Sequence, residues 1–319
     1  MCYSAQIRAE YRKFEREFGA TMDIRQYARF FWERRQDGSW RKITKAMKDA
    51  FADPRNEDER NIHDLIVAGD AELARTLETE LFAQKKRLAD AERALQARTT
   101  KKAGNERRIA RNKMEAAQRN LADLRRTERL PRDARIFPGQ YAPVMIVRDG
   151  KRVLVPMRYQ CRLPGWSEAA ERKYPGTYNA RRDSLEKTWA RLFGHRHGIM
   201  IVTAFYENVA RHKVEHRELA PGEKGENVVL EFRPQPPHDM LVACLWNHSP
   251  GGDSGLYSFA SITDQPPPEI AAAGHDRCII PIKPENVEAW LAPDPSNLPA
   301  LHAILDDRDR PYYEHRMAA

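Results

Sequence analysis

Hydrophobic residues recur at helical spacing through the first half of the chain. Two series stand out, the first made of Leu73, Leu77, Leu81, Leu88 and Leu95, and the second of Ala110, Met114, Ala117, Leu121 and Leu124. Steps of three, four and seven residues are typical of the seam of a coiled coil. The polar stretch 99–105, which contains Gly104, separates the two series, and Pro131 follows the second. The pattern predicts two helices of roughly 25–30 residues that form an antiparallel hairpin over about residues 70–129.

A different pattern begins near residue 136, where short apolar runs alternate with Pro and Gly. The runs are APVMIV at 142–147, RVLVPM at 152–157, HGIMIVTAFYE at 197–207, NVVLEF at 227–232 and MLVACLW at 240–246. They are rich in Val, Ile, Phe and Tyr, which favour strands. Their spacing favours an antiparallel or barrel-like β domain with inserted helices over a βαβ series, so the expected fold class is α+β. Neither a GxGxxG run nor a P-loop occurs, so no nucleotide cofactor is expected.

The positive charge of the chain is concentrated in the predicted hairpin. The 319 residues carry a formal net charge of +8, and between residues 84 and 129 there are 15 Lys or Arg against 6 Asp or Glu. The remainder of the chain is therefore close to neutral. A concentrated basic segment indicates a protein that binds a polyanion such as nucleic acid, although Arg also suits a solvated helix because it is a good helix former. Extended DNA contact and docking of a protein partner both stay open for residues 84–129.

Cysteine usage and hydropathy indicate the cellular setting. Cys161, Cys244 and Cys278, like Cys2, show no CxxC spacing, which argues against a zinc site and for a reducing compartment. No run of about 18 apolar residues occurs, and the charged N-terminal stretch lacks the apolar core of a signal peptide. We expect a cytoplasmic protein that crosses no membrane and needs no metal or other cofactor.

Cys2 is the residue with the most distinctive chemistry. Removal of Met1 would leave a free α-amine and a thiol on neighbouring atoms of Cys2. Such a 1,2-aminothiol condenses with an aldehyde to an imine, which the thiolate closes to a thiazolidine ring. It can also attack an amide with its own amine as the base, in the manner of N-terminal nucleophile enzymes. An α-amine and a cysteine thiol ordinarily titrate near about 7.7–8.0 and about 8.5, so both groups are partly deprotonated near neutral pH.

Three polar clusters interrupt the apolar runs of the second half. They are Tyr178-Asn179-Ala180-Arg181, Phe205-Tyr206-Glu207 and Gly274-His275-Asp276-Arg277. Taken with Cys2, the run 138–147 and the turn 163–166 that ends in Trp166, their order resembles the SOS response-associated peptidase (SRAP) family, the abasic-site processing proteins. The resemblance covers residues 1 to about 15 and about 135 to 295.

The resemblance implies a domain organisation. Residues 1–19 would form the N-terminal part of the SRAP domain, which carries Cys2, and residues 131–319 its main β part with a C-terminal helix and tail. Residues 20–130 would be a helical insertion that contains the basic hairpin, because family members separate these two parts by a much shorter segment.

The resemblance also implies an activity. Family members recognise an abasic site in single-stranded DNA, whose ring-opened sugar exposes an aldehyde at C1′, and the processed Cys2 captures it as a Schiff base and then as a thiazolidine crosslink. By this likeness Asn179 would hydrogen-bond the opened sugar or the N-terminal amine. Glu207 would exchange protons with the opening sugar and the imine, and His275 would act as acid or base at the sugar hydroxyl. Removal of Met1, by the protein itself or by a general aminopeptidase, gives the family its peptidase name. Such a protein would associate with the nucleoid when it is bound to DNA.

The same likeness assigns three side chains to the DNA. Arg181 and Arg277 would hold phosphates through charge-assisted hydrogen bonds. Trp166 would stack on or wedge between bases, a contact worth roughly 1–3 kcal/mol per base, unless it is a core tryptophan beside its Pro-Gly turn. The sequence departs from the usual family pattern at Asp183, where a Glu is common, and at Ser4, where an Arg is common.

Two other functions remain open. A glutaminase-type amidohydrolase would use Cys2 equally well, but it gives no reason for the order of the three polar clusters or for a basic hairpin. A non-enzymatic DNA-binding scaffold would act through the hairpin and would need none of the polar residues of the β domain. Neither alternative accounts for Asn179, Glu207 and His275 together.

Overall fold

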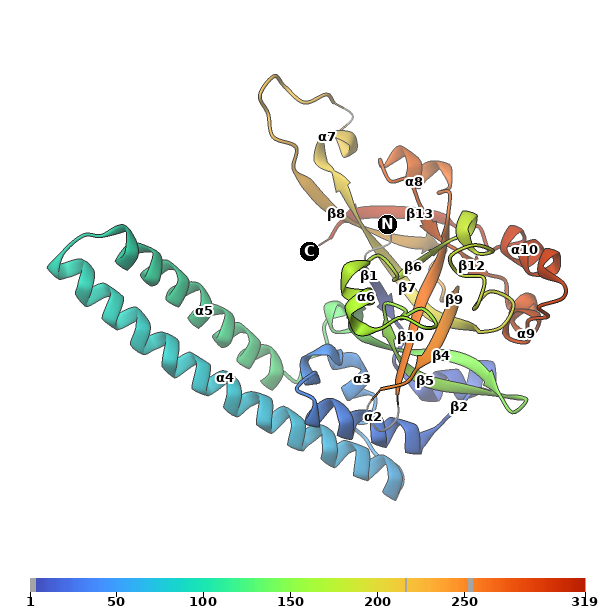
Figure 1. Ribbon diagram of the computed structural model, residues 1–319, viewed down its shortest axis with the longest axis horizontal. Coiled ribbons are helices and arrows are strands. Elements are labelled where there is room, and N and C mark those ends of the chain that lie inside the picture. The colour runs from blue at the N-terminus through green and yellow to red at the C-terminus, as the bar shows by residue number, and fades with distance from the viewer. Residues whose placement is uncertain (1–3, 216, 252–254, 319) are drawn as a thin grey trace. The chain divides into compact units, whose positions relative to one another are not determined.

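The computed structural model describes residues 4–215, 217–251 and 255–318. The chain divides into two compact units (Figure 1). The first unit contains Met1–Phe30, Arg41–Asp53 and Pro131–Ala319, and the second contains Phe31–Trp40 and Pro54–Leu130. A β-sheet dominates the first unit and a long helical hairpin the second, so the α+β class is confirmed.

The described strands pair into one mostly antiparallel sheet. They are β1 (Ser4–Ile7), β2 (Thr21–Met22), β3 (Arg135–Ile136), β4 (Tyr141–Arg148), β5 (Lys151–Tyr159), β6 (Asn179–Arg181), β7 (His197–Ala210), β8 (Asn227–Gln235), β9 (Met240–Ser249), β10 (Leu256–Asp264), β11 (Cys278–Ile279), β12 (Pro281–Ile282) and β13 (Tyr312–Met317). The five apolar runs predicted as strands lie in β4, β5, β7, β8 and β9. Near the end of the chain, β13 adds an outer strand that pairs with β8.

Part of the sheet closes into a barrel. Strands β9, β10, β5, β4 and β7 pair in this order, and β7 pairs again with β9. Every pair in this ring is antiparallel except β10 with β5. Strand β7 is buried over most of its length, because β9 pairs with its first half while β1 and β8 pair with its second half. The barrel-like β domain predicted from the apolar runs is therefore confirmed.

Short helices lie between the strands along the chain. They are α1 (Tyr11–Phe18), α2 (Ile24–Gln36), α3 (Lys45–Asp49), α6 (Glu168–Lys173), α7 (Arg211–Val214), α8 (Pro268–Ala272), α9 (Val287–Leu291) and α10 (Leu298–Asp306). In the first unit, the rings of Tyr11 and Tyr27 both pack against Phe51, which ties α1 and the start of α2 to the segment after α3. Within the described ranges, no helix is both long and apolar enough to cross a membrane.

Two long helices, α4 (Glu57–Ala97) and α5 (Lys101–Arg125), make up most of the second unit. Three ion pairs join them: Glu78 with Arg125, Arg87 with Glu106, and Glu92 with Arg111. From the Glu78 pair to the Glu92 pair, the residue number rises on α4 from 78 to 92 and falls on α5 from 125 to 111. The two helices are therefore antiparallel. The buried positions of the seam are Leu77, Ala91, Ala103, Ala110 and Ala117. The predicted hairpin is confirmed. Of the predicted apolar stripe, Leu77, Ala110 and Ala117 are buried, and the other members are half-buried.

The ends of the two helices differ from the prediction. Helix α4 has 41 residues because it begins at Glu57, where the side chain of Asn56 accepts a hydrogen bond from the third helical N–H. The predicted break at 99–105 is too long, since only 98–100 lie outside the helices. Thr100 caps α5 in the same way, and Gly104 lies inside α5. A Cβ at Gly104 would meet no atom within 4 Å, so this glycine marks neither a turn nor a close contact, and the helix tolerates its cost of about 1 kcal/mol.

Candidate functional site

Two of the polar clusters meet at the C-terminal end of β10. Strand β6, which is the Asn179-Ala180-Arg181 cluster, runs parallel to residues 261–263 of β10. The loop that carries His275 leads into β11, which pairs antiparallel with residues 263–264 of β10. Segments that are far apart in the sequence are thereby held on either side of one strand end.

Glu207 and His275 form a buried pair. Glu207 lies inside β7, opposite Leu230 of β8, and its side chain is completely buried. Its Oε2 atom lies 3.1 Å from Nε2 of His275, whose side chain is 7% exposed. A buried carboxylate is costly unless a hydrogen bond or an opposite charge compensates it. A protonated His275 would compensate the charge of Glu207, and the contact between them joins the third polar cluster to the second.

Backbone groups of Arg277 hold the other nitrogen of the His275 ring. Nδ1 lies 2.9 Å from the carbonyl oxygen of Arg277 and 3.3 Å from its backbone nitrogen. A protonated Nδ1 donates to the carbonyl, whereas an unprotonated Nδ1 accepts from the N–H. The ring therefore keeps a hydrogen-bond partner whether or not Nδ1 carries a proton.

Burial and the backbone of Arg277 act on the protonation of His275 in opposite directions. Burial lowers the pKa of His275 below its ordinary value, and the backbone hydrogen bond with Arg277 opposes that shift. The neutral imidazole is thus favoured near pH 7. A neutral His275 carries its single ring proton either on Nε2, which faces Glu207, or on Nδ1, which faces the carbonyl oxygen of Arg277.

Gly274 brings the His275 loop against β7. Its φ of +91° lies in the left-handed region, which side chains disfavour. A Cβ at this position would lie 2.9 Å from Cβ of Lys213 and 3.0 Å from Cγ1 of Val209, two residues beyond Glu207 on β7. Glycine is therefore needed both for the backbone conformation and for the close approach that sets the distance between Glu207 and His275.

Asn179 and Thr263 add polar groups on the strands that carry the clusters. Asn179 is 6% exposed and begins β6. Thr263 pairs with Arg181 on one side of β10 and with Ile279 on the other. Its hydroxyl is buried, and among the described residues it has no hydrogen-bond partner, which is uncommon for a buried polar group. Sequence reasoning missed Thr263, because a Thr within an apolar strand is also an ordinary β-former.

Arg181 and Arg277 share an acidic neighbour at the surface. Arg181 binds Asp183 in a bidentate manner, with Nε 3.0 Å from Oδ1 and Nη2 2.6 Å from Oδ2. The hydrogen bond from Arg181 lowers the pKa of Asp183, and the charge of Arg277 adds to this effect. Arg277 is mostly buried and lies 3.8 Å from Asp276. The two predicted phosphate-binding arginines are thus brought together, but a phosphate would compete with Asp183 for Arg181.

Trp166 lies on a separate loop. It is half-buried, and its ring centre lies 5.6 Å from that of the exposed Tyr174, with the rings tilted by 50°. The loop is anchored by Glu171, whose buried carboxylate accepts hydrogen bonds from Arg158 and Arg162. The described contacts do not connect Trp166 with the Glu207–His275 pair. Sequence reasoning missed Tyr174, because its partner stands eight positions away and no regular periodicity links the two.

The cysteines within the described residues are chemically inert. Cys2 lies outside those residues, whereas Cys161, Cys244 and Cys278 are free and buried. Burial raises the pKa of Cys161 and of Cys244 to about 12, and it raises the pKa of Cys278 as well. These three thiols stay protonated at neutral pH and are poor nucleophiles. Among the described His, Cys, Asp and Glu side chains, no group of three is placed to hold a metal ion.

Comparison with known proteins identifies the family. The SOS response associated peptidase (SRAP) family matches residues 97–317, which is more than half of the chain. The chain therefore belongs to the SRAP family. The match begins at the last residue of α4 and includes all of α5, the β-sheet from β3 onward, and the Asn179, Glu207 and His275 clusters.

Several solved structures are similar to part of the chain. A protein of Bordetella bronchiseptica is 17% identical, with a TM-score of 0.46 over 58% of this chain and 87% of its own. A phage-related protein of the same organism is 18% identical, with a TM-score of 0.43 over 58% and 81%. A protein of Bacteroides thetaiotaomicron is 14% identical, with a TM-score of 0.45 over 58% and 78%. No curated protein matches the chain.

Proposed function

We propose that this protein captures abasic sites in single-stranded DNA through a covalent bond to Cys2. The SRAP family takes its name from the SOS response, which suggests association with DNA and with DNA damage. The single observation that carries the proposal is the buried pair of Glu207 and His275, whose facing atoms are 3.1 Å apart. Condensation of an aldehyde with an amine and a thiol needs groups that donate and accept protons, and a carboxylate beside an imidazole can supply both roles.

The proposed reaction joins the N-terminal residue to the sugar in two steps. After removal of Met1, the α-amine of Cys2 attacks the C1′ aldehyde of the ring-opened sugar, a C–N bond forms, and the aldehyde oxygen leaves as water. The thiolate of Cys2 then adds to the imine carbon, and the imine nitrogen takes up a proton as the thiazolidine ring closes. No oxidant, metal or cofactor is consumed, and the product is the sum of both reactants minus one water.

Glu207 and His275 would serve the proton transfers of both steps. The carboxylate accepts a proton from the attacking amine and returns it to the departing hydroxyl. His275 exchanges a proton at the sugar hydroxyl. Its Nδ1 accepts from the N–H of Arg277 when it is unprotonated and donates to the carbonyl oxygen of Arg277 when it is protonated, so it keeps a hydrogen-bond partner in both states. Asn179 would orient the opened sugar or the amine through its side-chain amide.

Surface groups around the pair would hold the DNA. Arg181 and Arg277 would bind phosphates, and Asp183 would limit how tightly Arg181 does so. The partly exposed ring of Trp166, backed by Tyr174, would offer a stacking surface to a base. Such contacts position the strand without reading its sequence, which suits a protein that recognises a missing base.

Removal of Met1 is the peptidase part of the proposal. Hydrolysis of the Met1–Cys2 bond adds one water and frees the α-amine that the capture step requires. In purified protein that retains Met1, we expect this cleavage to proceed slowly and to stop in Glu207→Gln, with intact mass as the readout.

Denaturing gel electrophoresis tests the capture reaction. Wild type and Cys2→Ala, both with Met1 removal verified by intact mass, are mixed with single-stranded DNA that holds one abasic site or none. We expect a heat-stable shifted band from wild type with the abasic strand alone. A fully processed wild type that gives no band contradicts the proposal, and release of ammonia from glutamine by the same preparation would favour the amidohydrolase.

A further inference from the structure

The distal half of the hairpin carries a surplus of positive charge that its own carboxylates do not neutralise. From residue 84 to residue 129 each acidic side chain but Glu128 has an arginine partner, through ion pairs of Arg87–Glu106, Arg93–Asp90, Arg111–Glu92, Arg119–Glu115 and Arg126–Asp123. In the same described stretch, eight exposed cations have no carboxylate partner: Lys85, Lys86, Arg98, Lys101, Lys102, Arg107, Arg108 and Lys113.

These eight cations lie close together in space. They occupy the last residues of α4, the connection at 98–100 and the first half of α5. Because the helices are antiparallel and rise about 1.5 Å per residue, the cations share roughly the last 20 Å of the hairpin. Like charges at such density repel one another and weaken the fold unless an anion screens them.

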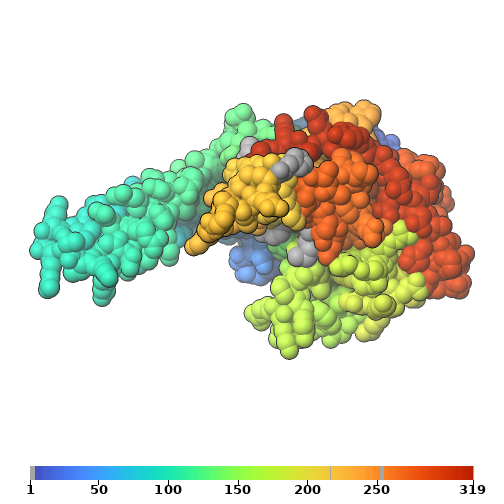
Figure 2. Space-filling model, turned by 90° about the horizontal axis from the view of Figure 1, so that it is seen from above, coloured from blue at the N-terminus to red at the C-terminus, as the bar shows by residue number. Residues whose placement is uncertain are grey.

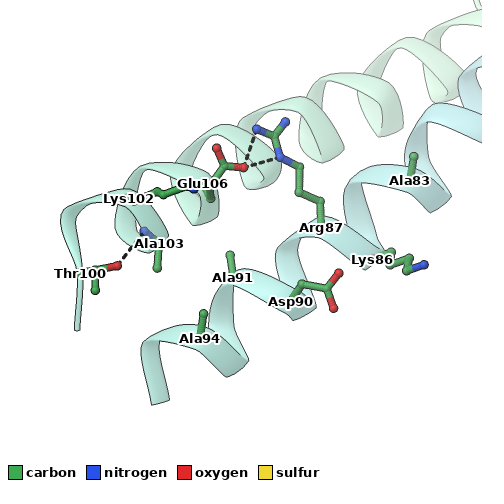
Figure 3. Close-up of a pocket in the computed structure, with 10 residues that line it drawn as sticks. All are labelled: Ala83, Lys86, Arg87, Asp90, Ala91, Ala94, Thr100, Lys102, Ala103 and Glu106. Atoms are coloured by element: carbon green, nitrogen blue, oxygen red, sulfur yellow. Dashed lines mark hydrogen bonds and ion pairs between the residues drawn. The ribbon is translucent and has the colours of Figure 1, made fainter. Parts of the chain in front are cut away.

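A shallow groove crosses the same region of the hairpin. Figure 3 shows Ala91 and Ala94 pointing toward α5 and Ala103 pointing toward α4, so no bulky side chain fills the space between the helices there. Lys86 and Lys102, two of the unpaired cations, line this groove from opposite helices. The ion pair between Arg87 and Glu106 bridges the helices beside it and keeps them in register.

We infer that this distal half binds the phosphate backbone of double-stranded DNA. Duplex DNA carries one negative charge per about 1.7 Å of its axis, which complements a dense patch of lysines and arginines. Residues 84–129 contain no Phe, Tyr or Trp. One exposed ring, that of Phe82, lies beside these residues, with the amino group of Lys85 5.9 Å from its centre. A single ring is not the row of stacking platforms that single-strand binders use. The contact would be independent of sequence and separate from the capture of an abasic sugar.

Two matched variants of the full-length protein test this assignment. The distal variant replaces Lys86, Lys101, Lys102 and Lys113 with Gln. The control variant replaces four ion-paired arginines, Arg93, Arg111, Arg119 and Arg125, with Gln. Both lower the net charge by the same amount on the same two helices, and glutamine preserves helix propensity. Circular dichroism confirms that both hairpins remain helical.

Binding is measured by fluorescence anisotropy on a 30-base-pair duplex without an abasic site, in a Cys2→Ala background and over a range of salt. If each lost cation is a phosphate contact, the slope of log K against log salt flattens by about 3–4 in the distal variant, with affinity reduced at least about tenfold at low salt. The control variant should change the slope by less than about 1. Equal slopes in the two variants, or an effect confined to a single strand of the same sequence, would overturn the assignment. Because neither probe nor protein can form the crosslink, this result is independent of the capture reaction.

Discussion

Replacing Glu207 with glutamine removes the negative charge of the buried pair while keeping the size of the side chain. The amide can still accept a hydrogen bond from Nε2 of His275 through its oxygen, so the loop that carries His275 stays in place. Glutamine cannot take a proton from the attacking amine. Since Glu207 is completely buried, its side chain offers no surface to the phosphates, and DNA binding should stay unchanged.

The size of the effect follows from the role of the group. A positioned acid or base contributes about 10²–10⁴-fold to a rate, so Glu207→Gln should slow covalent capture by that factor. By contrast, Glu207→Ala also leaves a cavity at a completely buried position, which removes packing contacts and should lower the melting temperature. His275→Gln should slow capture to a similar extent.

Met1 is first removed from every variant with a methionine aminopeptidase and its loss verified by intact mass. Single-turnover capture on an abasic strand, with anisotropy for non-covalent affinity, then measures each variant. If Glu207 and His275 act as one unit, the double variant Glu207→Gln/His275→Gln is no slower than the slower single variant. Capture by Glu207→Gln at the wild-type rate would refute the role of the carboxylate. Multiplicative losses in the double variant would show that the two side chains act separately.

Three further outcomes are expected. Gly274→Ala should lower stability by about 1–2 kcal/mol from backbone strain alone, because the φ of Gly274 is +91°. The same change should slow capture. Gly104→Ala is the control and should not slow capture, because a Cβ at Gly104 would meet no atom within 4 Å. His197 is buried, and desolvation lowers its pKa to about 3. Since the unfolded chain binds this proton more tightly, the free energy of unfolding should fall by up to about 1.4 kcal/mol per pH unit below pH 6.5. In urea titrations, the stability of His197→Gln should depend less on pH than that of wild type. Asp183→Asn frees Arg181 from its bidentate partner and should tighten DNA binding by up to about fivefold, with weaker binding in anisotropy counting against a phosphate contact.

Periodic features of the chain were predictable from its sequence. The seam residues Leu77, Ala110 and Ala117 are buried where the repeat predicts them, because a helix with one apolar stripe must cover it. The ends of the helices were less predictable. Gly104 was a misleading stop signal, since Thr100 offers a better cap and a single glycine is tolerated in a long helix.

The candidate site depended on long-range contacts that no local pattern contains. The complete burial of Glu207 results from its pairing with β8 and from the loop at Gly274, which are distant in the sequence. The order of polar clusters indicated which residues matter, but not that Asp183 occupies Arg181 or that Thr263 lies between the two clusters. Cys2 lies outside the described residues, so its role stays a prediction.

Intact mass spectrometry of the crosslinked product tests the central claim most directly. Processed wild type is incubated with a single-stranded oligonucleotide that holds one abasic site, and the adduct is weighed and then digested. We predict the mass of the protein without Met1 plus the oligonucleotide minus one water, with the sugar located on the peptide that begins at Cys2. An adduct located on a lysine, or no adduct from protein that lacks Met1, would contradict covalent capture through Cys2.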